Sequence, residues 1–116
     1  MDSRNHVQLI GRLGGEPTVR DTKSGKFARF SIAINEQFSD NGQSRTNTQW
    51  HNVVAWRKLA EKIESSCHKG NEVMICGKLT SHSYEDQNKV KKYVTEVLAS
   101  EIVCMSKNEQ KEVAVA

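Results

Sequence analysis

The sequence predicts an all-β protein: a five-stranded barrel with one short helix between the third and fourth strands. Apolar and polar residues alternate along five segments, which is the period of a half-buried strand. A sixth segment repeats its apolar residues at helical spacing, and turn residues separate the segments. The chain has 116 residues, of which 36% are hydrophobic, enough for one modest core. We therefore expect one domain over residues 1–105 and a short disordered tail over 106–116.

A turn rich in glycine separates the first two strands. Residues 6–13 alternate, and the two glycines and single proline of residues 14–17 then break the strand. Residues 26–35 alternate again and place four apolar side chains on one face, while the other face is polar apart from Phe27 and Ala33. This second strand is thus predicted to have an inner and an outer face.

The middle of the chain predicts a long loop, the third strand and the helix. Residues 36–49 are rich in Asn, Gln, Ser and Thr and contain an Asn-Gly turn signal, so we expect a hairpin loop. Residues 50–56 alternate as a strand. Residues 58–67 space their apolar side chains for a short amphipathic helix, with Gly70 as its C-terminal cap.

Two further strands complete the pattern. Residues 72–80 alternate, residues 92–103 are rich in Tyr, Val, Thr and Ile, and the polar residues 81–91 between them predict a hairpin. The resulting order is three strands, one helix and two strands. This is the element order of the OB-fold, a partly open Greek-key barrel that binds oligonucleotides or oligosaccharides on one face.

The aromatic residues give the first functional indication. Trp50 and Trp56 lie on the same face of their strand, about 20 Å apart, and share this face with Asn52. A tryptophan in a strand more often belongs to the core, but two observations favour exposure here. The opposite face carries smaller side chains that suit a narrow barrel interior, and Phe38 and Tyr84 lie in predicted polar loops. We therefore predict four exposed rings, spaced for separate bases of an extended strand.

Composition and motifs narrow the function classes. The net charge of +3 permits a polyanionic partner without requiring one. The apolar runs are too short for a membrane span, and residues 1–5 resemble no targeting signal, so we expect a cytoplasmic protein. The sequence has no GxSxG or GxxxxGK[ST] motif, and residues 23–26 lack the upstream glycine of a phosphate loop. We expect no enzyme activity, no catalytic residues and no cofactor.

The cysteines and histidines indicate no metal site. Cys67, Cys76 and Cys104 are an odd number at wide, irregular gaps, which argues against a disulfide framework and against a CxxC site. We expect all three to be reduced packing residues. The four histidines show no ligand spacing with these cysteines. No metal is therefore predicted.

Seven segments together resemble the bacterial single-stranded DNA-binding proteins of the SSB family. They follow the family's order over about residues 4 to 104, and they are NHVQLIGRLG (5–14), EPTVR (16–20), FSIA (30–33), WHNVV (50–54), KLAE (58–61), KG (69–70) and KYVTEV (92–97). The resemblance implies an OB-fold that assembles as a homotetramer, a dimer of dimers, and wraps single-stranded DNA on aromatic rings. It also implies a cytoplasmic, nucleoid-associated protein that protects DNA during replication, recombination and repair.

The resemblance also implies site residues. Base stacking falls on four rings, whose identities are permuted relative to better-known members: Phe38, Trp50, Trp56 and Tyr84. Lys58 and Lys69 match basic positions of the family's DNA surface. Seven further cations are candidates for phosphate contacts: Arg4, Arg12, Arg20, Arg29, Arg57, Lys78 and Lys92. His51 corresponds to a histidine near the family's subunit interface, and we assign His6 to the oligomer interface with it.

Two features depart from the family. Residues 79–84 are less basic than the hairpin that members usually carry there, and residues 113–116 stand where members usually continue into a linker and an acidic tip. Recruitment of repair and replication proteins through such a tip is therefore not expected. The alternative function is an adaptor, as in dimeric OB-fold proteins of replication restart. Those relatives generally lack the set of stacking rings.

Overall fold

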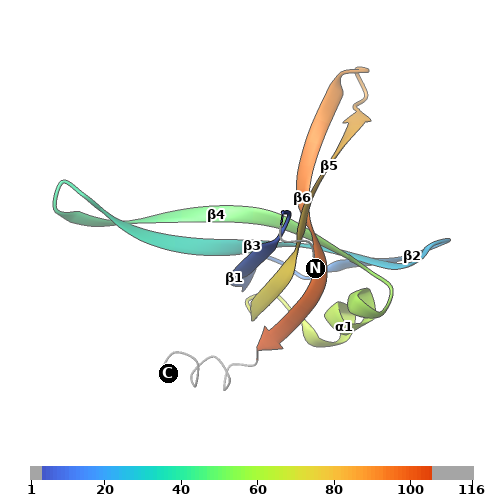
Figure 1. The fold of residues 1–116 in the computed structure, drawn as a ribbon, viewed down its shortest axis with the longest axis horizontal. Coiled ribbons are helices and arrows are strands. Elements are labelled where there is room, and N and C mark those ends of the chain that lie inside the picture. Colours follow the sequence, from blue (N-terminus) through green and yellow to red (C-terminus); the bar gives the residue numbers. More distant parts are fainter. Residues whose placement is uncertain (1–3, 106–116) are drawn as a thin grey trace.

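The computed structural model describes residues 4–105 (Figure 1), and the tail predicted over 106–116 lies outside the described residues. The elements are, in chain order, β1 (Val7–Leu13), β2 (Thr18–Thr22), β3 (Gly25–Asp40), β4 (Gln43–Trp56), α1 (Lys58–Ser66), β5 (Glu72–Glu85) and β6 (Lys91–Met105). Within residues 4–105, α1 is the only helix.

Five of the strands close into a barrel. β1 pairs with β5, β5 with β6, β6 with β4, β4 with β3, and β3 pairs back with β1. All of these pairs are antiparallel except β4 with β6. The predicted five-stranded OB-fold barrel is confirmed, with α1 between the third and fourth strands of the barrel. β2 is an additional strand, and in this part of the chain it pairs with β3 alone.

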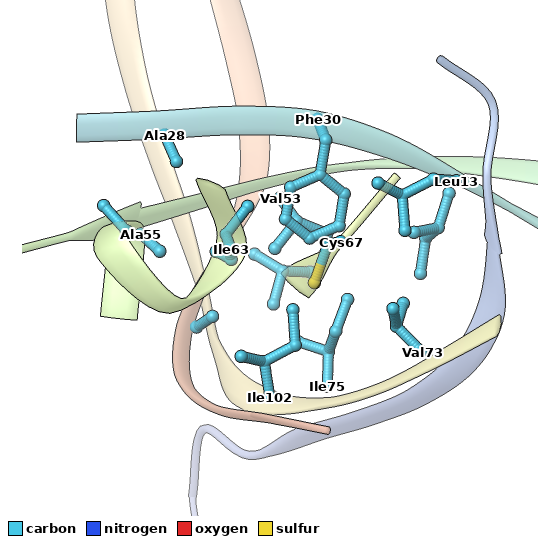
Figure 2. Packing of buried hydrophobic residues seen from close by; sticks show 14 residues of the cluster. Leu13, Ala28, Phe30, Val53, Ala55, Ile63, Cys67, Val73, Ile75 and Ile102 are labelled. Carbon is cyan, nitrogen blue, oxygen red and sulfur yellow. The ribbon is translucent and has the colours of Figure 1, made fainter. Parts of the chain in front are cut away.

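The barrel interior is built from the apolar faces of the alternating strands. Its side chains pack against one another and against α1 (Figure 2). The buried cluster consists of Leu13, Ala28, Phe30, Ile32, Val53, Ala55, Ala60, Ile63, Cys67, Val73, Ile75, Val97, Ala99 and Ile102. Ala60 and Ile63 lie one helical turn apart, and α1 contacts β3, β4 and β6 through this face. Trp50 and Trp56 are not part of this cluster, and both are exposed on the outside of the barrel.

Strands extend beyond the segments in which apolar and polar residues alternate. Residues 18–22, for which no element was predicted, form β2, in which only Val19 is partly buried. Residues 36–49 form a two-stranded arm closed by a turn at Asn41 instead of the predicted hairpin loop, whereas the hairpin predicted over 81–91 is confirmed and is the end of a second arm. The strands of the first arm were missed because alternation in the sequence reports burial of one face. Backbone hydrogen bonds between two strands form equally well when both faces are polar.

The two arms leave the barrel in different directions (Figure 1). We call them the β3–β4 arm (residues 36–49) and the β5–β6 arm (residues 81–95). They give the molecule a radius of gyration of 16.1 Å, against about 13 Å for a compact chain of this length. The arms therefore add exposed surface outside the barrel without enlarging its core.

A β-bulge lies where β5 and β6 cross from the barrel into the arm. The pairing register shifts between Cys76 and Gly77, and the backbone of β6 approaches Gly77 closely. A Cβ at this position would overlap the carbonyl oxygen of Leu98 and lie 2.9 Å from its carbonyl carbon. Both are backbone atoms, so no side-chain rotation can relieve the contact. Only glycine fits there without separating the two strands.

We expect Gly77→Ala to lower the free energy of unfolding by about 1–3 kcal/mol, the usual effect of overpacking a well-ordered site. Chemical denaturation at a fixed protein concentration measures it. Gly15→Ala is the matched control, because no atom lies within 4 Å of a Cβ built on Gly15. Equal unfolding free energies for the two variants would contradict the proposed backbone contact.

The cysteines differ from the prediction. Cys67, which follows α1, forms a disulfide with Cys104 of β6, while Cys76 is a buried free cysteine. The expectation of three reduced residues was wrong because spacing along the chain does not report distance in space: the fold brings the two Cα atoms to 5.8 Å. Cys67 is also the C-cap of α1, so the prediction that Gly70 caps this helix was wrong. Gly70, with φ of 85°, belongs to the turn that follows.

Candidate nucleic-acid interface

The outward face of β2, β3 and β4 brings the predicted tryptophans together with polar and basic side chains. Cross-strand partners in a sheet point to the same side. The registers align Arg20 with Phe27 and Trp56, Ser31 with Asn52, and Ala33 with Trp50. We call this surface the outer face, and its members are Thr18, Arg20, Phe27, Arg29, Ser31, Ala33, Trp50, Asn52, Val54 and Trp56.

One end of the outer face is a cluster of two rings and two guanidinium groups. The rings of Phe27 and Trp56 lie 4.7 Å apart between centroids and are tilted by 53°. The Cζ atoms of Arg20 and Arg29 lie 5.9 and 5.8 Å from the centroid of Phe27. Such cation–π contacts hold the guanidinium groups beside the rings. Trp56 remains 39% exposed, so its ring can contact a ligand while the cations lie close to it.

The other end of the outer face is formed by Trp50, which is 58% exposed. Its indole lies against the turn between β1 and β2: a Cβ on Gly14 would lie 2.5 Å from Cζ3 of Trp50 and 3.5 Å from the hydroxyl of Ser31. The indole of Trp50 can pack against this turn only because Gly14 has no side chain. Neither tryptophan belongs to the core, and the prediction that both lie exposed on one face is confirmed by the structure.

The other two predicted stacking rings lie on the arms. Phe38 is exposed on the β3–β4 arm opposite Arg45, and strand alternation places it on the other face of the ribbon from Trp50. Tyr84 is exposed on the β5–β6 arm. The structure therefore does not bring these rings into the outer face. They offer separate contact points along the arms.

Two aromatic residues were missed by the sequence analysis. Phe27 was noted only as an exception on a polar face, although its place beside Arg29 could have indicated a site. Tyr93 was noted only as part of a family segment, yet it is 72% exposed, with the Nζ of Lys91 at 5.6 Å from its ring centroid. Tyr93 and Tyr84 occupy alternate positions of the paired strands and so lie on opposite faces of the β5–β6 arm.

A buried carboxylate orients one of the predicted phosphate ligands. Glu96 of β6 is 7% exposed and is the only buried charged residue within the described range. Its Oε2 accepts a hydrogen bond from Nη2 of Arg29 at 2.9 Å, and its Oε1 lies 3.1 Å from Nε2 of His82. Arg29 thus spans Glu96 and the Phe27 ring, which fixes its position at the edge of the outer face.

The junction between β4 and α1 holds two more of the predicted cations. Arg57 has φ of 60°, and its Nε donates a hydrogen bond to the carbonyl oxygen of Ser24 at 3.2 Å. Lys58 begins α1 and is exposed. Nearby, Nζ of Lys26 donates a hydrogen bond to Oε1 of Glu64 at 2.6 Å, and this bond raises the pKa of Lys26. Arg57 and Lys58 therefore extend the basic surface beyond Trp56.

The remaining predicted cations are exposed, and one of them adjoins the outer face: Arg12 of β1 pairs with Ala33, so its side chain lies on the same side as Trp50. Nη1 of Arg12 donates to the carbonyl oxygen of Gly70 at 3.2 Å, and Nζ of Lys92 lies 3.9 Å from Oδ2 of Asp86. Three others complete the set: Arg4, Lys69 and Lys78. Their distribution over the barrel and the β5–β6 arm places positive charge along several sides of the molecule.

The histidines and acidic residues form no site of their own. His6 is exposed before β1, and His51 is partly buried on β4 opposite Ile32. Their assignment to an oligomer interface stays a prediction. Among residues 4–105 no three His, Cys, Asp or Glu side chains gather as metal ligands. The same residues contain no helix that is long and apolar enough to span a membrane.

Comparison with known proteins agrees with this geometry. The single-strand binding protein family model matches residues 4–105. Single-stranded DNA-binding protein 1 of Chlorobaculum tepidum is 41% identical over 102 residues, which are 84% of this chain and 62% of that protein. Single-stranded DNA-binding protein B of Bacillus subtilis is 37% identical over 99 residues, which are 84% of this chain and 87% of that protein.

A solved structure shows the same architecture. The complex of a Plasmodium falciparum SSB with ssDNA has a TM-score of 0.82 and 29% sequence identity, and the match covers 91% of this chain and 98% of that one. A relative from Neisseria meningitidis serogroup A is 37% identical, but the match covers 59% of its length. The chain thus spans about three fifths of the Chlorobaculum and Neisseria relatives. On this evidence the chain belongs to the single-strand binding protein family.

Proposed function

We propose that this protein binds single-stranded DNA without strong sequence preference and protects it during replication, recombination and repair. Bases stack on Trp50 and Trp56 of the outer face, and on Phe38 and Tyr84 of the arms. The observation that carries the proposal is the pair of exposed indoles on one face, with Arg20 and Arg29 beside one of them. Every base has a π-face, so stacking tolerates any sequence.

The basic residues supply the second part of the proposed mechanism. Phosphates are neutralised by five cations at or near the outer face, which are Arg12, Arg20, Arg29, Arg57 and Lys58. Four others act elsewhere on the surface: Arg4, Lys69, Lys78 and Lys92. Neutralising a phosphate releases a condensed counterion, which adds affinity that depends on salt rather than on sequence. Stacking and counterion release together describe a binding protein, which agrees with family membership and requires no catalytic group.

We also propose that the chain assembles as a homotetramer, a dimer of dimers. The support within the described residues is an apolar row on the outside of the β1, β5 and β6 strands: Ile10 pairs with Met74, which pairs with Val103. Ile10 and Val103 are 51% and 45% exposed, and such a row suits an isologous contact. His6 and His51 are assigned to the subunit contacts. Sedimentation velocity reads out the assembly directly.

Titration of tryptophan fluorescence with oligo(dT) tests the proposed function. We expect strong quenching, because both indoles stack on bases, and little change with duplex DNA of the same length. An adaptor that binds only proteins would give no quenching with either. Repeating the titration at several salt concentrations should give a log–log slope of about −0.7 for each phosphate neutralised. A flat salt response would contradict the role assigned to the basic residues.

A further inference from the structure

The outer face contains a hollow between its two tryptophans. Its volume is about 230 Å³, and polar side chains from three strands line it: Thr18, Arg29, Ser31 and Asn52. The turn at Gly15 and Glu16 forms the remaining wall together with Phe30. The pair of Ser31 and Asn52 lies between the register of Trp50 and that of Trp56, so the hollow lies in the path that joins the two rings.

A DNA strand that stacks on both rings must place nucleotides over this hollow. Trp50 and Trp56 are about 20 Å apart along β4. Neighbouring nucleotides of one strand are about 3.4 Å apart along the axis of duplex DNA. The two rings therefore cannot stack adjacent bases, and at least one intervening base passes over Ser31 and Asn52.

The lining has neutral hydrogen-bonding groups without partners. Within residues 4–105 no hydrogen bond involves the side chains of Thr18, Ser31 or Asn52. An asparagine amide carries donors and an acceptor side by side, and each hydroxyl can donate and accept. The edge of a nucleobase presents donors and acceptors of the same kind. The polar groups of the hollow thus match a base edge.

A carboxylate in the wall of the hollow argues against a phosphate at the same place, so a phosphate that Arg29 neutralises lies outside the hollow. Glu16 contributes a carboxylate to the wall, and its oxygens contact the backbone N–H of Lys69 and Nδ1 of His68, each at 3.3 Å. A phosphate would approach this carboxylate against like-charge repulsion. A neutral base edge meets no such penalty.

We propose that the hollow binds one unpaired nucleobase through its edge, with the amide of Asn52 as the main hydrogen-bonding group and the hydroxyls of Ser31 and Thr18 beside it. This subsite rests on the proposed single-stranded DNA binding and adds a contact that stacking does not provide. With thymine, Oδ1 of Asn52 accepts from N3–H and Nδ2 donates to O4. Asn52 is thus a base-edge contact between two stacking platforms.

A double-mutant cycle between protein and DNA tests the subsite. The DNA is oligo(dT) and an oligonucleotide of equal length in which every thymine is replaced by difluorotoluene, which keeps the shape of thymine and stacks but forms no comparable hydrogen bonds. We expect Asn52→Ala to weaken binding of oligo(dT) about three- to tenfold, the usual contribution of a net hydrogen bond. The same change should leave the affinity for the difluorotoluene oligonucleotide nearly unaltered.

The controls separate the subsite from the wider function. Asn47→Ala is the matched control for Asn52→Ala, because Asn47 is exposed on β4 but lies on the opposite side, the face that carries Phe38; any effect it has should be equal for the two oligonucleotides. Ser31→Ala should show a smaller effect of the same kind as Asn52→Ala. If Asn52→Ala weakens both oligonucleotides equally, or neither, the base-edge subsite is overturned while single-stranded DNA binding stands. If the unaltered protein binds neither oligonucleotide, the proposed function itself fails.

Discussion

Replacing both Trp50 and Trp56 by alanine should weaken oligo(dT) binding by about 2–6 kcal/mol, because each base stack contributes about 1–3 kcal/mol. This corresponds to a loss of affinity between about 30-fold and more than ten thousandfold. The two rings are exposed at opposite ends of the outer face, so the single effects should add. Each single variant should retain measurable binding, because the other ring and the basic residues remain.

The measurement needs a probe other than the tryptophans themselves. Anisotropy of a labelled oligo(dT) provides it, at fixed salt and protein concentration. The double replacement by phenylalanine is the matched control: it keeps a π-face at each position and should recover most of the affinity. The thermal unfolding midpoint of each variant is measured alongside, so that a loss of binding is compared only between folded proteins. A folded alanine double variant that binds like the unaltered protein would disprove stacking on the outer face.

The barrel could be predicted from the sequence, and the β3–β4 arm could not. Residues such as Ile32 and Val53 alternate with outward residues because one face of each barrel strand is buried, and this burial leaves a period of two in the sequence. In the arms both faces are exposed, so no period remains. The strand pairing of Phe38 with Arg45 depends on backbone hydrogen bonds, which any residue except proline can form.

Of the candidate site, the sequence predicted which rings are exposed but not which residues contact them. The exposure of Trp50 and Trp56 follows from the small side chains that share β4 with them. The contacts between elements do not follow from any local pattern: Gly14 gives Trp50 its place across a turn, and Glu96 reaches Arg29 from a strand 67 residues away in the chain. Such long-range partners are set by the barrel topology, which a one-dimensional pattern does not contain.

The disulfide between Cys67 and Cys104 is another long-range contact of this kind, and it predicts a large effect on stability. It closes a chain segment with a sequence separation of 37, and loss of such a cross-link lowers the free energy of unfolding by about 3–4 kcal/mol in the chain-entropy model. It joins the C-terminal end of α1 to β6, so it also restrains the element that covers the core. We therefore expect a reducing agent to destabilise the unaltered protein by this amount.

Cys104→Ser should lower the free energy of unfolding by the same 3–4 kcal/mol and make it insensitive to the reductant, because Cys104 is only partly buried and the variant leaves the core residue Cys67 unchanged. Cys76→Ala is the matched control: Cys76 is a free cysteine, so this variant should keep the full response to the reductant. Denaturant unfolding with and without reductant, at one protein concentration, measures all three proteins. If the reductant changes the free energy of unfolding of none of the three proteins, the disulfide does not stabilise the barrel. Packing of Ala60 and Ile63 alone then holds α1 in place.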